Sequence, residues 1–239
     1  MTVRAVPGLA VSALVALAAA GAVAPAADAV APRVRQLVAF RDGHALQKRV
    51  STAATSVTVG GRRCVVGART PLAALRRSRP GRLSIRDFGA CSSDPADGAG
   101  LLVTRIGPDR NRAQRGWVYK VGHRAATAGA GDPGGPFGHG RLRAGQRVTW
   151  FYCVRATDCQ RTLSLRVRPM TGGIAAVVRG YDDAGDGVPI EQARVSAGGI
   201  TGLTAADGRV QLALPPGTHR VIARKDGLVR SFTERVRVP

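Results

Sequence analysis

Four cysteines carry the clearest chemical information in this sequence. An even number of cysteines behind an N-terminus typical of export favours disulfides over free thiols or zinc. Three pairings are possible, and we expect Cys64 to pair with Cys91 and Cys153 with Cys159, because the second pair lies close along the chain. None of the histidines lies at ligand spacing from a cysteine pair, so we expect no metal site. The histidines are His44, His123, His139 and His219.

Carboxylates give little indication of catalysis. Residues 33–170 contain seven Asp and no Glu, whereas a glycosidase needs two carboxylates with separated pKa values. Asp87 and Asp94 flank Cys91 without forming a recognisable pair. A Ser-His-Asp order with supporting motifs is also missing from the sequence. We therefore expect no enzyme activity and no cofactor.

One glycine-rich stretch and one acidic stretch resemble functional loops, but each lacks residues that the function needs. Gly131-Asp-Pro-Gly-Gly-Pro136 differs by one residue from a serine-protease signature, but Pro133 has no hydroxyl to act as nucleophile. The prolines also remove amides that a phosphate loop needs. Residues 181–187 cluster three aspartates without the alternate spacing of a calcium loop. We expect both stretches to be turns.

Basic charge is concentrated in the first part of the chain. Residues 33–170 hold 26 Lys and Arg against seven Asp, and residues 171–239 hold nine against seven acidic residues. This asymmetry favours an anionic partner for the first part, either an acidic wall polymer or lipid headgroups. Expected export argues against nucleic acid, and an ordinary solvated face is the alternative. The arginines that could bind such a partner are Arg76, Arg77, Arg79, Arg82, Arg110, Arg112 and Arg115.

The densest aromatic cluster lies in residues 146–159. Trp150 and Tyr152 fall on one face of an expected strand, and Phe151 and Cys153 fall on the other. Both faces are apolar, so we expect a central strand that is covered on each side. The alternative is an exposed aromatic patch that stacks on sugar rings or another small ligand. Its rings would be Trp117, Tyr119 and Trp150.

Short β-branched and aromatic runs with Gly or Pro boundaries predict mainly β structure. The first domain is expected to be a small α+β unit with strands near 56–59, 82–86, 116–121 and 147–152. Its one short helix should cover residues 71–78, with Thr70 as N-cap and Pro71 at the first position. Five strands between residues 174 and 238, separated by Asp-Gly and Pro-Gly turns, predict an immunoglobulin- or transthyretin-like β-sandwich.

The first 29 residues combine Arg4, an apolar run and the small-residue site Ala27-Asp-Ala29, and so predict a secretory signal peptide. We expect a secreted, extracellular or envelope protein. The expected organisation is a signal peptide over 1–29, a basic domain over 30–168, a linker over 169–172 and a β-sandwich over 173–239. A spacer role in a larger assembly is a further alternative to binding, and the sequence identifies no protein partner.

Two motifs in the first domain resemble the transcobalamin-like C-terminal domain family of exported bacterial proteins. They are Gly116-Trp-Val-Tyr-Lys-Val-Gly122 and Leu142-Arg-Ala-Gly-Gln-Arg-Val-Thr-Trp-Phe-Tyr152, although Gly122-His123 replaces the family's Asn-Gly and Gln146 its usual Asp. The resemblance covers about residues 55–165. It implies a β-rich domain that encloses a corrinoid in vertebrate relatives. We do not carry that role over, because the chain offers no partner domain for the other half of such a site.

The second domain resembles the carboxypeptidase regulatory-like, or transthyretin-like, sandwich family. The residues concerned are Gly187-Val-Pro-Ile190, Thr204-Ala-Ala-Asp-Gly208 and Leu214-Pro-Pro-Gly217. They belong to turns and the core, so the resemblance implies architecture and no chemistry.

Overall fold

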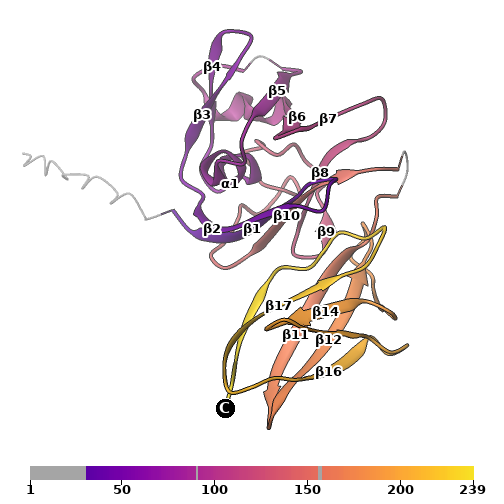
Figure 1. Ribbon diagram of the computed structural model, residues 1–239. Coiled ribbons are helices and arrows are strands. Elements are labelled where there is room, and N and C mark those ends of the chain that lie inside the picture. The colour runs from indigo at the N-terminus through magenta and orange to yellow at the C-terminus, as the bar shows by residue number, and fades with distance from the viewer. Residues whose placement is uncertain (1–30, 90, 156–157) are drawn as a thin grey trace, which may run out of the picture.

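The computed structural model describes residues 31–89, 91–155 and 158–239. The expected signal peptide lies outside these residues. The described chain is mainly β, as predicted, and its two large core clusters divide it into two domains (Figure 1). Its elements arise where short apolar or β-branched runs are bounded by turn residues.

A five-stranded sheet organises the first domain. In spatial order it contains β2 (Ala45–Ser51), β1 (Arg33–Ala39), β10 (Arg147–Cys153), β8 (Gly116–Val121) and β9 (Arg124–Ala125). β10 runs parallel to β1 and antiparallel to β8. It is therefore the central strand, and residues 148–153 are all buried, which confirms the prediction made from its two apolar faces.

Smaller elements cover one side of this sheet. They are the hairpin of β3 (Thr55–Val59) and β4 (Arg62–Val66), and the three-stranded sheet of β5 (Leu83–Asp87), β6 (Leu101–Ile106) and β7 (Asp109–Arg110). The helix α1 (Pro71–Ser78) starts as predicted, because the Thr70 hydroxyl accepts the backbone N–H of Ala73. A 3₁₀ helix, η1 (Pro95–Gly100), precedes β6.

The second domain consists of two four-stranded sheets. One joins β11 (Thr162–Met170), β12 (Gly173–Tyr181), β13 (Gly187–Pro189) and β16 (Arg209–Ala213). The other joins β15 (Ile200–Leu203), β14 (Arg194–Ala197), β17 (Gly217–Arg224) and β18 (Glu234–Val238). Buried residues of both sheets form one core, including Ile174, Leu212 and Val221. This packing is the expected β-sandwich.

The domain boundary differs from the prediction. Residues 162–170 are paired with β12 along their whole length, so β11 belongs to the sandwich. Residues 169–172, expected to be a linker, close the β11–β12 hairpin instead. The boundary therefore moves from residue 168 to about residue 160. A hairpin and a linker share the same turn residues, which explains the error.

Both disulfides form as predicted, Cys64 with Cys91 and Cys153 with Cys159. The first fixes β4 to the segment after β5, and the second closes the turn after β10. Two disulfides are typical of a protein that works in an oxidising, extracellular environment. None of the helices in the described part of the chain has the length and apolar character of a membrane span.

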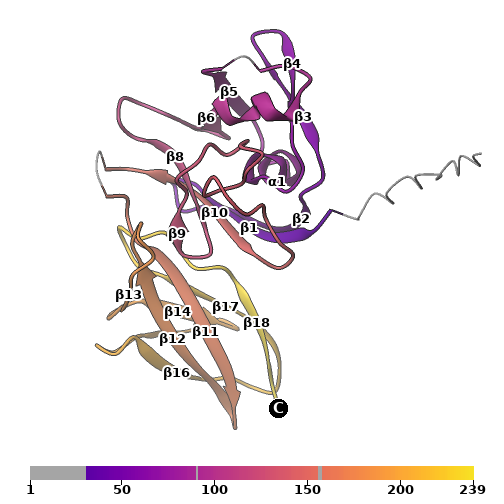
Figure 2. The ribbon, with the colours of Figure 1, turned by 180° about the vertical axis from the view of Figure 1, so that it is seen from behind.

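The central sheet also forms the contact between the domains (Figures 1 and 2). Trp150 and Tyr152 on one face of β10 belong to the core of the first domain. Phe151 on the other face packs with Ala39 and with Val229 from the second domain. The two apolar faces of β10 therefore do different things: one fills a core and the other joins two domains.

Candidate functional site

An apolar pocket of about 410 Å³ lies around the edge of β8. β9 pairs with β8 only at Lys120 and Val121, so no strand in the described part of the chain covers the edge from Gly116 to Tyr119. The pocket occupies this position and is closed by β6 and by residues 125–130. Its wall includes Trp117, Tyr119 and Trp150, the three rings that the sequence singled out.

These three rings are held in fixed positions. Tyr119 and Trp150 have ring centroids 4.9 Å apart, and the Tyr119 hydroxyl donates to the Ala128 carbonyl at 2.8 Å. The Trp117 indole N–H donates to the Asp109 carbonyl at 2.9 Å. The Trp150 indole nitrogen is buried and has no hydrogen-bond partner in the described part of the chain. Burial, with the charge of Asp132, raises the pKa of Tyr119, so its hydroxyl stays protonated.

The rings do not form the exposed platform that sugar stacking would require. Trp117 is 5% exposed, Tyr119 8% and Trp150 1%. They therefore form a pocket wall and part of the core rather than an open surface, which corrects that alternative. The side chains at the mouth of the pocket are more exposed than the three rings: Phe88 is 63% exposed and Leu102 43%. Large apolar side chains gathered at a concave site are a common feature of ligand pockets.

Glycines allow residues 125–130, which close the pocket, and the following Gly131 to approach η1 closely. A Cβ on Gly129 would meet the Ala99 carbonyl, and a Cβ on Gly131 would meet the Gly98 carbonyl. The segment also bonds to the start of α1, since Leu72 N–H donates to the Ala130 carbonyl. The start of the glycine-rich connection between β9 and β10, residues 129–131, therefore packs against η1 and α1 beside the pocket.

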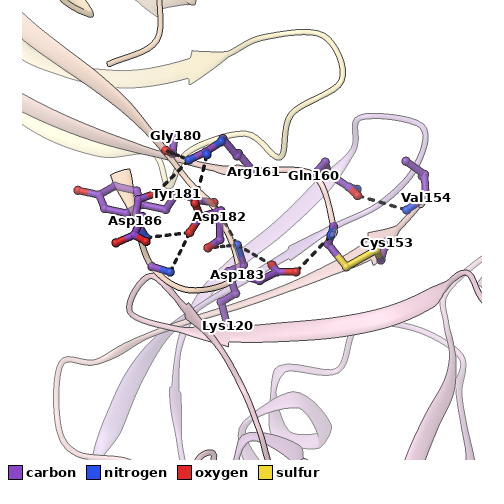
Figure 3. Close-up of polar contacts among 12 residues, drawn as sticks. Lys120, Cys153, Val154, Gln160, Arg161, Gly180, Tyr181, Asp182, Asp183 and Asp186 are labelled. Atoms are coloured by element: carbon purple, nitrogen blue, oxygen red, sulfur yellow. Dashed lines mark hydrogen bonds and ion pairs between the residues drawn. A yellow bond between two sulfur atoms is a disulfide. The ribbon is translucent and has the colours of Figure 1, made fainter. Parts of the chain in front are cut away.

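A buried lysine stands at the other side of the pocket. Lys120 on β8 is 1% exposed and points toward residues 181–183 of the second domain (Figure 3). Its ammonium lies 3.0 Å from Asp183 Oδ1 and donates to the carbonyls of Tyr181 and Asp182 at 3.1 and 2.7 Å. Burial lowers the pKa of Lys120, and Asp183 opposes that shift. The lysine therefore holds the two domains together beside the pocket.

The neighbouring aspartate turn is stabilised by its own side chain. Asp182 Oδ1 accepts the backbone N–H groups of Gly185 and Asp186 at 3.0 and 2.8 Å. Its Oδ2 lies 3.1 Å from the guanidinium of Arg161 (Figure 3). These are the contacts of an ordinary Asx turn.

A histidine that the sequence did not single out stacks across the same junction. His123 lies in the β8–β9 turn, and its ring is parallel to that of Tyr181 with centroids 3.6 Å apart. Burial lowers the pKa of His123 from 6.5, and the positive charges of Arg147, Arg166 and Lys120 lower it further.

Acid is therefore expected to weaken the folded protein through His123. Because its pKa is lower in the folded chain, the unfolded chain takes up the proton first as pH falls below 6.5. The stability that His123 contributes is complete above pH 6.5 and is lost toward its lower folded pKa. Melting temperatures at pH 7.5 and 5.0 should differ more in the wild type than in His123→Phe. Equal differences in the two proteins would contradict this expectation.

The seven arginines expected to bind an anionic partner occupy two regions. Arg76, Arg77, Arg79 and Arg82 lie at and just beyond the end of α1, and Arg110, Arg112 and Arg115 lie in and after β7. All seven are exposed, and none forms an ion pair within the described residues. Arg77 differs from the others because its guanidinium donates to the carbonyls of Ala53 and Ala54.

Comparison with known proteins finds no similar protein. No protein-family model matches the chain, and no curated protein or solved structure matches it either. The fold and pocket define a class, a two-domain β protein with two disulfides in its first domain and an apolar pocket lined almost entirely by that domain. The two family resemblances seen in the sequence motifs stay predictions.

Proposed function

We propose that this protein is an exported, non-catalytic binding protein that takes one small, largely apolar ligand in the β8-edge pocket. The observation that carries this proposal is the pocket itself, about 410 Å³ with three aromatic rings in its wall. Pockets of about 300–1,000 Å³ lined mainly by apolar and aromatic side chains are typical of small-molecule sites. Exposed Phe88 and Leu102 at its mouth support the same conclusion.

A non-catalytic role is supported by the structural contacts that the cysteines and several aspartates make. All four cysteines are in disulfides. Several aspartates of the first domain bond to backbone groups: Asp87 accepts the N–H groups of Gly89 and Cys91, and Asp94 caps η1. Groups used in this way hold turns in place. They are poor candidates for the paired acid and base of a hydrolase.

Export is proposed from the first 29 residues together with the disulfides. In this proposal the second domain is a support. It covers Phe151 and receives Lys120, and so fixes the sheet that carries the pocket.

Filling the pocket should weaken ligand binding. We expect the neutral dye N-phenyl-1-naphthylamine to bind the wild type, and Ala128→Phe to weaken binding at least tenfold, because Ala128 lines the pocket. The measurement is energy transfer from tryptophan to the dye. The dye is neutral, so raising the salt concentration should leave its affinity unchanged.

Ala144→Phe is the matched control, because Ala144 is exposed and lies outside this pocket. It should bind the dye like the wild type. Equal binding by Ala128→Phe and Ala144→Phe, with both proteins folded, would refute the pocket as the binding site.

A second candidate function is binding of an anionic wall polymer or of lipid headgroups by the first domain. The observation in its favour is that seven exposed arginines form no ion pair with any described residue. Arginine pairs with such anions would weaken steeply as salt rises. This salt dependence separates the second function from the apolar pocket.

A further inference from the structure

A second hollow, of about 400 Å³, lies between the two domains. The first domain contributes the β1–β2 turn, residues 39–44, and the end of β10. The second domain contributes the loop after β17, residues 224–230. Phe151 and Val229 line it and belong to the small core cluster between the domains. The hollow therefore has apolar packing beneath it and loops from both domains around it.

The charged side chains that line this hollow are mostly basic. Arg41, Arg224, Lys225 and Arg230 line it, and two carboxylates, Asp42 and Asp226, lie on the same lining. No ion pair among the described residues involves any of these four cations. The Asp42 carboxylate is already engaged, because it accepts the backbone N–H of His44 at 2.9 Å. The site thus holds a surplus of positive charge.

Contacts within the protein hold two of the arginines in place. Arg224 Nη1 donates to the Gly43 carbonyl of the other domain at 3.2 Å. Arg230 donates from Nε to the Ser231 carbonyl and from Nη2 to the Thr233 hydroxyl, at 3.1 and 2.8 Å. Its Nη1 has no hydrogen-bond partner in the described chain. A fixed guanidinium with free N–H groups is suited to a planar or tetrahedral oxyanion.

Arg41 completes the arrangement from the first domain. Its guanidinium carbon lies 5.2 Å from the centroid of the Tyr152 ring, and Tyr152 also lines the hollow. Among described residues its side chain makes no hydrogen bond. Arg41 and Arg230 are 189 positions apart in the sequence, which is why charge counting along the chain does not detect the site.

Electrostatics within the cluster is unfavourable when nothing is bound. Burial, together with repulsion from Arg224 and Arg220, lowers the pKa of Arg230 to about 10. Among the described residues, Arg230 forms no ion pair with a carboxylate that would offset these effects. A bound anion would relieve both the repulsion and the missing hydrogen bonds.

We propose that this interdomain hollow binds a phosphate-type oxyanion through Arg41, Arg224 and Arg230. The group could belong to free phosphate or to a phosphate ester, whose organic part would lie on the apolar side near Val229. The site is separate from the β8-edge pocket, and the proposal does not depend on the function proposed for that pocket. Because both domains supply its arginines, an occupied site would hold them together more firmly.

Titration calorimetry with inorganic phosphate, at constant ionic strength, tests the proposal on the mature chain. We expect saturable binding by the wild type and at least a tenfold loss in Arg230→Gln. Arg237→Gln removes the same charge from an exposed position on β18 and should change affinity less than twofold. No saturable binding by the wild type, or equal losses in the two variants, would overturn the proposal.

Two additions keep the test decisive if Arg230→Gln folds poorly. Arg41→Gln removes an exposed side chain without hydrogen bonds in the described structure, so this variant should fold normally. Its affinity for phosphate should nevertheless be at least threefold lower than that of the wild type. Wild-type affinity of Arg41→Gln would contradict the proposal. A parallel titration with glycerol 3-phosphate shows whether the bound group is free phosphate or a phosphate ester. Tighter binding of glycerol 3-phosphate than of inorganic phosphate indicates an ester. Equal binding indicates the free ion.

Discussion

Replacing Lys120 with alanine is expected to lower the free energy of unfolding by about 3–5 kcal/mol. Lys120 is buried between the domains, pairs with Asp183 and donates to the carbonyls of Tyr181 and Asp182. Its removal would leave a carboxylate without its cation and two carbonyls without a donor. Such a loss is large because Lys120 and Asp183 Oδ1 are buried, although the Asp183 side chain as a whole is 34% exposed, so water cannot easily replace the lost ammonium.

Chemical denaturation of wild type and variant measures this effect. Lys225→Ala is the control, since the Lys225 ammonium donates to one carbonyl, that of Glu191, at an exposed site. It should cost less than about 1 kcal/mol. Lys120→Met with Asp183→Asn should be more stable than Lys120→Met alone, because the unpaired carboxylate is gone. A loss below 1 kcal/mol in Lys120→Ala would show that the lysine does not join the domains.

Removing the Cys64–Cys91 disulfide should have the second largest effect. The two cysteines are 27 positions apart, and the chain-entropy model gives about 3.5 kcal/mol for a loop of this length. Cys153 and Cys159 are six positions apart, for which the same model gives about 2 kcal/mol. Cys64 also belongs to the core of the first domain, so its bond ties β4 into packed surroundings.

The two double alanine variants form a matched pair. Urea denaturation should show the larger loss for Cys64→Ala with Cys91→Ala, by about 1 kcal/mol or more. The shorter disulfide provides the control, since both variants remove one bond and two sulfur atoms. A larger loss for the Cys153 and Cys159 variant would contradict the loop-length argument and would point to a greater structural role for the turn after β10.

Local features of the fold were predictable because they depend on neighbouring residues. Thr70 and Pro71 mark the start of α1, and the residues of β10 alternate between two apolar faces, which made it a central strand. The β1, β2, β4 and β6 strands were not singled out. β2, for example, reads Ala-Leu-Gln-Lys-Arg-Val-Ser and lacks a clear apolar alternation.

The candidate sites were predictable only in part. Trp117, Tyr119 and Trp150 were identified from their motif, but whether they form an exposed patch or a pocket wall depends on β6 and residues 125–130. Lys120 did carry a signal, as one of three lysines and the one within an apolar strand. Its partner Asp183 lies 63 positions away and looked like an ordinary turn residue. Contacts between domains leave no local pattern in a sequence.

Nuclear magnetic resonance of the two tryptophan indole groups tests the binding function most directly. The chain has two tryptophans, both in the pocket wall, and one Trp117→Phe spectrum assigns their indole N–H signals. Those signals should be well separated, since Trp117 donates to Asp109 and Trp150 has no described partner. Adding N-phenyl-1-naphthylamine should shift both signals saturably. Unmoved signals up to the solubility limit of the dye, in a folded protein, would contradict a ligand-binding role for this pocket.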